Sequence, residues 1–188
     1  MTLSEGRLPP GQKWVDKITE YAVLGVPKVD IGAYRLRVRG EILNPLEFDL
    51  DQVKGMSDLE MVDDLHCVEG WSVRGVRWKG IPLRKIVDLA GPKVSATHVF
   101  FRCLDGYSTT IPIDETRKGG CLLATFMNGR ELEAELGFPV RLVVPGLYAW
   151  KYAKWVSEII FMDHYEPGYW ERRGYHPRGD VWKEERRE

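Results

Sequence analysis

The chain has few cysteines, and no two of them have metal-binding spacing. Cys67, Cys103 and Cys121 are the three cysteines among 188 residues, and no C-x-x-C motif occurs. An odd number of scattered cysteines argues against a disulfide framework and favours a reducing compartment. A domain of this length buries roughly 70% of the surface that its unfolded chain exposes, so it needs no disulfides for stability.

Long apolar runs and an excess of charge of either sign are also missing. No stretch of about 18 apolar residues occurs, so the sequence predicts no membrane span. Residues 1–17 lack the apolar segment of a secretory signal, and no twin-arginine or lipoprotein leader is present. The formal net charge is −1, so the chain has no general attraction for nucleic acid or anionic lipid. We therefore expect a cytoplasmic protein in which any basic site is local.

The remaining pattern predicts one β-rich domain of the mixed α+β class over residues 1–188. One helix is expected at 82–90, where apolar residues recur at helical spacing, and a hairpin is expected at Asn128-Gly129. Residues 1–13 are expected to form a loose arm and residues 172–188 a charged surface tail. The predicted strands, which are short and bounded by turn residues, are 34–40, 60–67, 98–103, 107–111, 122–127, 140–144 and 156–162.

Cys67 is the first candidate for chemistry, at the end of a predicted strand and before a Gly-Trp-Ser loop at 70–72. A thiolate is a soft ligand for transition metals, but one is too few for zinc, which needs four ligands. One thiolate suffices where a cofactor supplies the other donors. Two alternatives are a small buried apolar residue and a nucleophile, which needs a histidine base. The side chain of His66 is expected on the opposite side of the strand. Cys103 and Cys121 lie inside apolar runs and are expected in the core.

The second candidate is a cationic stretch at residues 141–155, which contains Arg141, Lys151 and Lys154. Phosphate groups need cations and backbone donors, and arginine offers a planar fork for them. A turn of helix over 150–155 would put both lysines on one face. The alternative is that these charges form a solvated rim.

The segment His-Cys-Val-Glu-Gly-Trp-Ser at 66–72 and the stretch 141–155, in this order, resemble the molybdenum-binding core of the sulfite oxidase family, in its stand-alone prokaryotic form. In that family one cysteine sulfur and two sulfurs of a pterin dithiolene hold the metal. The resemblance implies that Cys67 is the metal ligand and that the cofactor is molybdopterin carrying molybdenum, or tungsten. The resemblance extends into the tail at 166–176.

The resemblance also implies which residues hold the cofactor. The phosphate end is expected at Arg141, Lys151 and Lys154, with backbone contacts from Tyr152 and Ala153. One departure is Leu136, at a position where relatives often have a polar cofactor contact, so that contact must come from elsewhere.

Three aromatic side chains complete the predicted site. Trp71 and Trp150 are expected beside the cofactor. The segment 105–112 resembles the part of sulfite oxidases that places a tyrosine near the metal, which implies that Tyr107 is catalytic, as a partner for an oxyanion or for protons. The alternative is a strand tyrosine with its ring in the core and its hydroxyl at the surface.

The resemblance implies an oxidoreductase that transfers an oxygen atom to or from a small-molecule substrate and exchanges electrons with a separate protein. The substrate would be sulfite-like or an S- or N-oxide. The arginine cluster of a true sulfite oxidase is not evident, since Arg74, Arg77 and Arg102 are only loose candidates. Two other classes stay open: a molybdopterin-binding or carrier module without turnover, and a structural β-domain that binds no metal.

Overall fold

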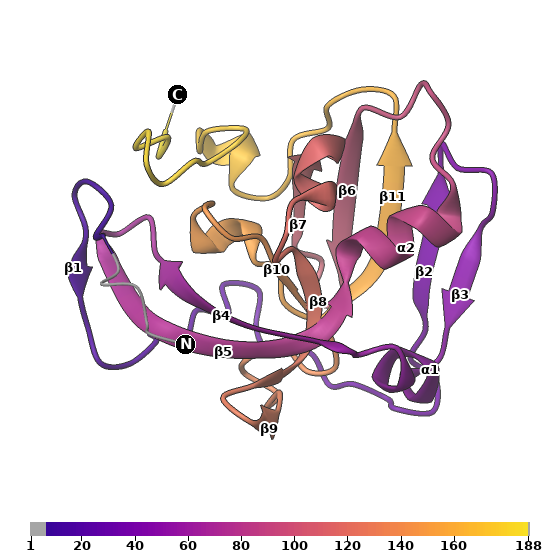
Figure 1. The fold of residues 1–188 in the computed structure, drawn as a ribbon, viewed down its shortest axis with the longest axis horizontal. Coiled ribbons are helices and arrows are strands. Elements are labelled where there is room, and N and C mark those ends of the chain that lie inside the picture. Colours follow the sequence, from indigo (N-terminus) through magenta and orange to yellow (C-terminus); the bar gives the residue numbers. More distant parts are fainter. Residues whose placement is uncertain (1–6, 188) are drawn as a thin grey trace.

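The structure, a computed structural model, describes residues 7–187 and is organised around two β-sheets (Figure 1). The helices in this range are α1 (Leu50–Gly55), α2 (Leu83–Ala90) and the 3-10 helices η1 (Ile113–Arg117), η2 (Ala149–Lys151) and η3 (Glu171–Arg173). The strands are β1 (Lys13–Trp14), β2 (Leu36–Gly40), β3 (Leu46–Phe48), β4 (Leu59–His66), β5 (Trp71–Pro82), β6 (His98–Cys103), β7 (Ser108–Pro112), β8 (Leu122–Met127), β9 (Arg130–Glu131), β10 (Arg141–Val143) and β11 (Val156–Met162).

A long hairpin of β4 and β5 dominates the first sheet. The two strands pair antiparallel up to His66 and Ser72, and residues 67–70 turn the chain between them. Strand β5 also pairs with β1 and β8, which gives the order β1-β5-β8-β10, with β4 added on β5 and β9 on β8. Figure 1 shows β5 as a long, curved strand, and the register shifts next to Asp63 and Gly80 are of the kind that bend strands.

The second sheet has the order β3-β2-β11-β6-β7, and β2 and β11 are its parallel pair. Strand β2 shows the alternation that the sequence predicts, because Leu36 and Val38 are buried whereas Arg37 and Arg39 are exposed. The exposed arginines pair with Glu47 and Glu158 on the neighbouring strands. At β2 and β3 one face of this sheet is therefore apolar and the other charged.

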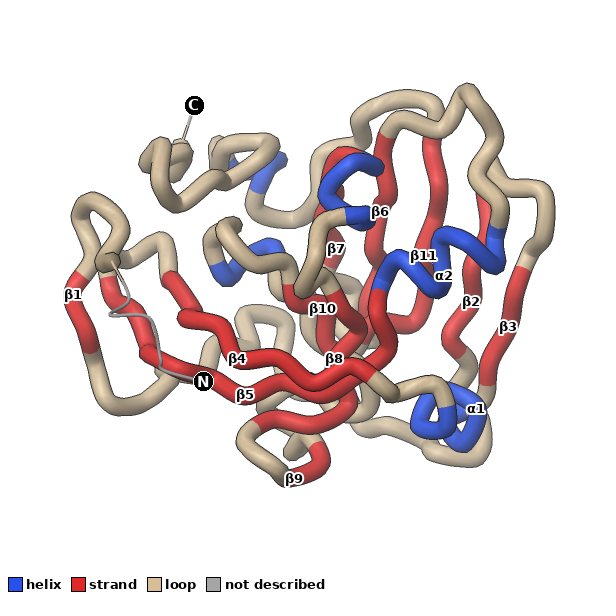
Figure 2. Tube along the Cα trace, viewed as in Figure 1, coloured by secondary structure: helices blue, strands red, loops and turns tan. Residues whose placement is uncertain are grey.

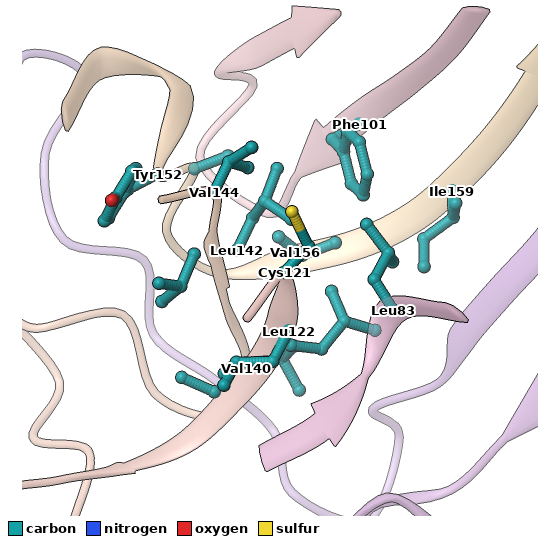
Figure 3. Close-up of a cluster of buried hydrophobic side chains, with 14 of the residues drawn as sticks. Leu83, Phe101, Cys121, Leu122, Val140, Leu142, Val144, Tyr152, Val156 and Ile159 are labelled. Carbon is teal, nitrogen blue, oxygen red and sulfur yellow. The ribbon is translucent and has the colours of Figure 1, made fainter. Parts of the chain in front are cut away.

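The hydrophobic core joins the two sheets. Figure 3 shows side chains from α2, β6, β8, β10 and β11 meeting in one cluster. Helix α2 contributes the stripe that its sequence spacing predicts, made of Leu83, Ile86, Val87 and Ala90. Cys103 and Cys121 are buried in this core, as predicted.

The prediction of a β-rich α+β domain is confirmed, and several elements agree in detail. The strands predicted at 98–103, 122–127 and 156–162 are β6, β8 and β11. Asn128 and Gly129 join β8 to β9 with φ values of 52° and 81°, as a two-residue hairpin turn of the I′ type requires.

Two local predictions are wrong. The predicted loop at 70–72 is placed too late in the sequence, because the turn lies at 67–70 and Trp71 and Ser72 begin β5. The prediction of a single helix misses α1, which begins with a capping box between Asp49 and Gln52. Six residues are too few for helical periodicity to stand out in a sequence.

The two ends of the described chain pack on the domain. Residues 1–6 of the predicted loose arm lie outside the described residues, but Lys13 and Trp14 pair in parallel with the start of β5. The predicted surface tail contains Val181, which is fully buried, and Figure 2 shows this segment as loops around one short helical turn. Within residues 7–187, no helix has the length and apolar character needed to cross a membrane.

Candidate active site

A cavity of about 330 Å³ brings together most of the predicted site residues. This volume lies at the lower end of the range for small-molecule and cofactor sites. The predicted residues that line it are Cys67, Trp71, Tyr107, Arg141, Trp150, Tyr152, Ala153 and Lys154. The fold therefore gathers the hairpin turn, the start of β7 and the cationic stretch around one space.

Cys67 begins the turn between β4 and β5. Its N–H donates to the carbonyl of Trp71 (2.8 Å), and its carbonyl accepts from the N–H of Gly70 (3.1 Å). Gly70 has a φ of 93°, in the left-handed region that favours glycine. The side chain is largely buried, and this burial raises the pKa of Cys67 to about 11. The thiol alone therefore holds its proton at neutral pH, and a bound metal would displace it.

A nucleophilic role for Cys67 lacks its base. The Nδ1 atom of His66 lies 2.8 Å from the hydroxyl of Ser72, and His66 does not line the cavity. No histidine of residues 7–187 lines this cavity. The alternation of side chains along β4 explains why the neighbour of Cys67 in the sequence faces elsewhere.

Tyr107 lies at the cavity with its ring buried. Its hydroxyl donates to the carbonyl of Trp150 at 2.5 Å, and its N–H donates to the carboxylate of Asp105 at 2.9 Å. Burial raises the pKa of Tyr107, so the phenol stays protonated. Because the hydroxyl proton points to the backbone carbonyl of Trp150, the phenolic oxygen can still accept a hydrogen bond from a group in the cavity.

Arg141 is a buried cation with few partners. Its side chain donates one hydrogen bond, from Nη1 to the carbonyl of Leu136 (3.1 Å), and Nε has no partner. Its guanidinium lies 5.5 Å from the ring centroid of Trp78, and it forms no ion pair with a carboxylate of residues 7–187. Burial lowers its pKa, but a guanidinium stays charged in proteins. A buried charge without a counterion is unfavourable, so an anion in the cavity would stabilise Arg141.

Lys154 is a second cation beside Arg141. The Cβ atoms of Lys154 and Arg141 both lie next to Gly137, because a Cβ added to this glycine would be 3.1 Å from the first and 3.2 Å from the second. The two side chains therefore begin close to each other. The ammonium donates to the carbonyl of Glu135 (2.7 Å) and lies 3.6 Å from the carboxylate of Glu20. Burial and repulsion from Arg141 lower the pKa of Lys154 to about 8.

The structure differs from the sequence prediction at Lys151. This side chain is fully buried, does not line the cavity, and donates to the carboxylate of Glu171 and to the carbonyls of Thr110 (2.8 Å) and Pro177 (2.5 Å). All three ammonium protons thus have acceptors within the protein. The helical turn expected over 150–155 ends at Lys151 as η2, so Lys151 and Lys154 do not share a face.

Sequence reasoning missed the residues that cover the cavity. The segment 18–23 lines it, and the hydroxyl of Tyr21 in this segment donates to the carboxylate of Glu69. Trp170 and Tyr175 line it from the C-terminal part of the chain. Trp170 and Tyr175 fall in the segment 166–176, where the resemblance gave them no role, and no motif marks the segment 18–23.

Three further sequence candidates lie elsewhere. The guanidinium of Arg74 stacks on Trp14 (4.4 Å), and that of Arg102 pairs with Glu158 (3.1 Å). Arg77 borders a separate, smaller pocket. None of these three arginines lines the main cavity, so they do not form the anion cluster of a sulfite site.

Comparison with known proteins shows that the chain is a molybdopterin-binding oxidoreductase domain. The sequence model of the family described as "Oxidoreductase molybdopterin binding domain" matches residues 23–170, and the chain belongs to this family. The uncharacterized oxidoreductase YuiH of Bacillus subtilis is 38% identical over 185 residues, which cover 96% of this chain and 92% of that protein.

More distant relatives are larger proteins. The protein-methionine-sulfoxide reductase catalytic subunit MsrP of Burkholderia mallei is 33% identical over 73% of this chain, and mitochondrial sulfite oxidase of Macaca fascicularis is 30% identical over 81% of it. The matched parts make up 46% and 33% of those two proteins. The sulfane dehydrogenase SoxCD of Paracoccus pantotrophus shares the fold, with a TM-score of 0.70 at 21% identity, over 80% of this chain and 42% of that one.

The residues at the cavity fit a molybdopterin. The unpartnered Nε of buried Arg141, with Lys154 beside it, suits the phosphate of the cofactor. The indole N–H of Trp150 is likewise buried without a partner. No group of three or more His, Cys, Asp or Glu side chains among residues 7–187 is arranged to hold a metal, so Cys67 would add one protein thiolate to the donors of the cofactor.

Proposed function

We propose that this chain is a molybdopterin-dependent oxidoreductase that transfers an oxygen atom to or from a small molecule at a metal centre ligated by Cys67. One observation supports this most directly. A single cavity is lined both by a cysteine thiol and by Arg141, a buried arginine that lacks a counterion. A soft metal ligand and a phosphate site are the two things that a metal-bearing pterin needs from its protein.

The protein residues would hold and shield the cofactor. Arg141 and Lys154 would bind its phosphate, and the backbone at Tyr152 and Ala153 would contact it. Trp71 and Trp150 are largely buried at the cavity and would exclude water from the reacting atoms. When bound, the cofactor would supply the metal, two sulfur ligands and the two-electron chemistry.

Tyr107 would hold and release a proton in this reaction. Its hydroxyl proton is directed to the carbonyl of Trp150, so donation to a substrate oxygen requires that this hydrogen bond be exchanged. Because burial raises the pKa of Tyr107, the phenol is a hydrogen-bond donor rather than a base at neutral pH. Its expected effect is to stabilise negative charge that develops on the transferred oxygen.

The substrate that fits this cavity best is an uncharged S- or N-oxide. Glu20, Glu69 and Asp105 line the same cavity as the two cations. The two cations would be engaged by the cofactor phosphate, which leaves carboxylates as the remaining charged groups near a substrate. These would repel sulfite, whereas a neutral oxide has no charge to be repelled. The relative named as a methionine sulfoxide reductase acts, by its name, on such an oxide.

The electrons are proposed to come from a separate electron-transfer protein, and the reaction to run in the direction of reduction. The metal is expected to be molybdenum, and tungsten would take the same ligands. The cytoplasmic location stays a prediction, which cell fractionation would check.

The test is metal and cofactor analysis combined with dye-linked turnover. Protein from cells that make molybdopterin should carry close to one molybdenum per chain. It should oxidise reduced viologen with dimethyl sulfoxide or trimethylamine N-oxide, and it should reduce an electron-accepting dye with sulfite much more slowly. Cys67→Ser should fold and lose this turnover, because a hydroxyl is a harder and weaker ligand than a thiolate. Bound cofactor without turnover of any dye would indicate the carrier module, and protein without metal or pterin would refute the proposal.

A further inference from the structure

The turn that carries Cys67 is held by two side chains from outside residues 23–170, the range that matches the family. Gln12 donates from Nε2 to the carbonyl of Cys67 (3.1 Å). Arg186 donates from Nη1 to the carbonyl of Val68, the next carbonyl along the turn. Two consecutive carbonyls at the candidate metal ligand thus depend on the two ends of the described chain.

Gln12 ties this turn to the strand that follows it. Its side-chain oxygen accepts a hydrogen bond from the hydroxyl of Ser72 (3.0 Å), and the same hydroxyl lies 2.8 Å from Nδ1 of His66. The backbone of the arm adds hydrogen bonds from Lys13 N–H to the carbonyl of Gly70 and from Val15 N–H to that of Ser72, both 2.9 Å. The arm therefore binds the turn with side-chain and backbone groups together.

Arg186 joins the turn to the arm from the other side. Its Nη2 donates to the carbonyls of Pro10 (3.3 Å) and Gly11 (3.2 Å), and its guanidinium lies 5.1 Å from the ring centroid of Tyr148. A planar guanidinium can bridge several carbonyls at once, which a lysine ammonium does less well. Gly11 has a φ of 65°, which favours glycine, and a Cβ there would lie 2.7 Å from Nη2 of Arg186 and from Oε1 of Glu184, so a larger residue would displace these side chains.

We propose that Gln12 and Arg186 are positioning residues that fix the backbone of the Cys67 turn and thereby the sulfur that ligates the metal. This rests on the proposed role of Cys67. Backbone hydrogen bonds close the turn at its two ends, from Cys67 N–H to the carbonyl of Trp71 and from Gly70 N–H to that of Cys67. The carbonyl of Val68, in the middle of the turn, is held by the Arg186 side chain. Groups that orient a metal ligand affect metal binding and activity by 10–100-fold when they are removed. One residue of the charged tail would thus serve the site directly.

The test uses the full chain in its cofactor-free form, purified from cells that cannot make molybdopterin, and in its loaded form. Arg186→Gln removes the planar guanidinium and its charge, and Gln12→Met removes the side-chain hydrogen bonds at similar size. Lys183→Gln is the control, because it removes one exposed charge from the same tail. Hydrogen exchange by mass spectrometry should show faster exchange at the amides of Cys67 and Gly70 in both test variants and no change in the control.

The loaded forms provide a second readout. The sulfur-to-metal charge-transfer absorption of the Arg186→Gln protein should shift, and its turnover should fall by about 10–100-fold. Arg186→Lys should recover part of both, because it keeps the charge but not the fork. Exchange at wild-type rates in folded variants, with an unchanged absorption band, would refute the inference.

The hydrogen-exchange measurement does not depend on the proposed function. If wild-type protein never binds molybdenum, the proposed function is refuted, but faster exchange in the variants still shows that Gln12 and Arg186 hold the turn. If Arg186→Gln does not fold, Gln12→Met and Arg186→Lys carry the same comparison. The exchange rates should also be measured in the double variant of Gln12→Met and Arg186→Lys. Non-additive changes in exchange would show that the two residues act on one turn, and additive changes would contradict a shared role.

Discussion

Lys151 and Glu171 form an ion pair whose side chains are 0% and 1% exposed. The pair joins η2, next to the cavity, to the first residue of η3 in the C-terminal part of the chain. The hydroxyl of Thr109 also donates to Glu171, at 2.6 Å. Lys151 is thus a buried part of the structure that carries Trp150 and Tyr152.

Removing one member of this pair should destabilise the fold. Lys151→Met leaves the carboxylate of Glu171 buried without its cation, which typically reduces the free energy of unfolding by about 3–5 kcal/mol. Urea unfolding of the cofactor-free protein measures this. The double variant Lys151→Met with Glu171→Leu should recover much of the loss, because it leaves no unpaired charge. Equal losses in the single and double variants would contradict this account.

Arg141→Met should act in the opposite direction on stability and on cofactor binding. In the cofactor-free chain it replaces a buried cation that has no counterion, so the free energy of unfolding should rise, by about 1–4 kcal/mol. The molybdopterin content of the purified protein should fall at the same time. Arg102→Met, at an exposed ion pair, is the control and should change neither quantity much. Lower stability together with full cofactor content would show that Arg141 serves the fold alone.

The pKa of Lys154, lowered to about 8, predicts how stability depends on pH. An unfolded lysine titrates at about 10.4, so between these values the unfolded chain binds more protons than the folded one. The stability of the cofactor-free protein therefore rises with pH across this window because of Lys154. Lys154→Met should remove this contribution, seen as a flatter profile in urea unfolding at pH 8 to 10. Lys183→Met should keep the wild-type slope.

Glu20→Gln should increase anion binding by the cofactor-free protein. The Glu20 carboxylate lies 3.6 Å from the ammonium of Lys154 and competes with an anion for this cation. Sulfate is a suitable probe because its charge does not change near neutral pH. Calorimetry should show a several-fold tighter binding than in wild type, and Glu133→Gln, an exposed carboxylate, should bind sulfate as wild type does. Weaker binding by Glu20→Gln would mean that Glu20 supports the site.

The two core cysteines should respond differently to serine. Cys121 donates from its thiol to the carbonyl of Glu115 (3.0 Å), and a hydroxyl can keep this bond. Cys103 is buried, and its thiol has no such partner among residues 7–187. Cys103→Ser should therefore reduce the free energy of unfolding by about 1–3 kcal/mol, the penalty of an unsatisfied buried hydroxyl, and Cys121→Ser by less. Equal losses in thermal unfolding would contradict this assignment.

Features with a local signal were predictable from the sequence. The spacing in α2, the Asn128-Gly129 turn and the alternation in β2 are each properties of a few consecutive residues, and each is confirmed. The fate of Lys151 was not predictable in this way, because it depends on Glu171 and on two carbonyls brought in by the tail. A lysine beside a cavity and a lysine in a buried pair look the same in a sequence.

The same limit applies to the candidate site. The motif at 66–72 and the stretch 141–155 predicted which segments meet, since a resemblance over consecutive residues carries that information. The contacts of Gln12, Glu20 and Arg186 come from irregular segments whose course is set by packing alone. Their partners lie far away along the chain, so no spacing rule could indicate them.

Strand β2 pairs with β11 in parallel, from Arg37 opposite Glu158 to Gly40 opposite Phe161. During synthesis β2 therefore leaves the ribosome long before its partner exists, and one edge of it stays open while more than a hundred residues are added. Open strand edges invite pairing with other nascent chains, and charged side chains on such edges oppose it. We expect Arg37 and Arg39, which lie on the exposed face of β2, to oppose such pairing until Glu158 is synthesised and pairs with Arg39.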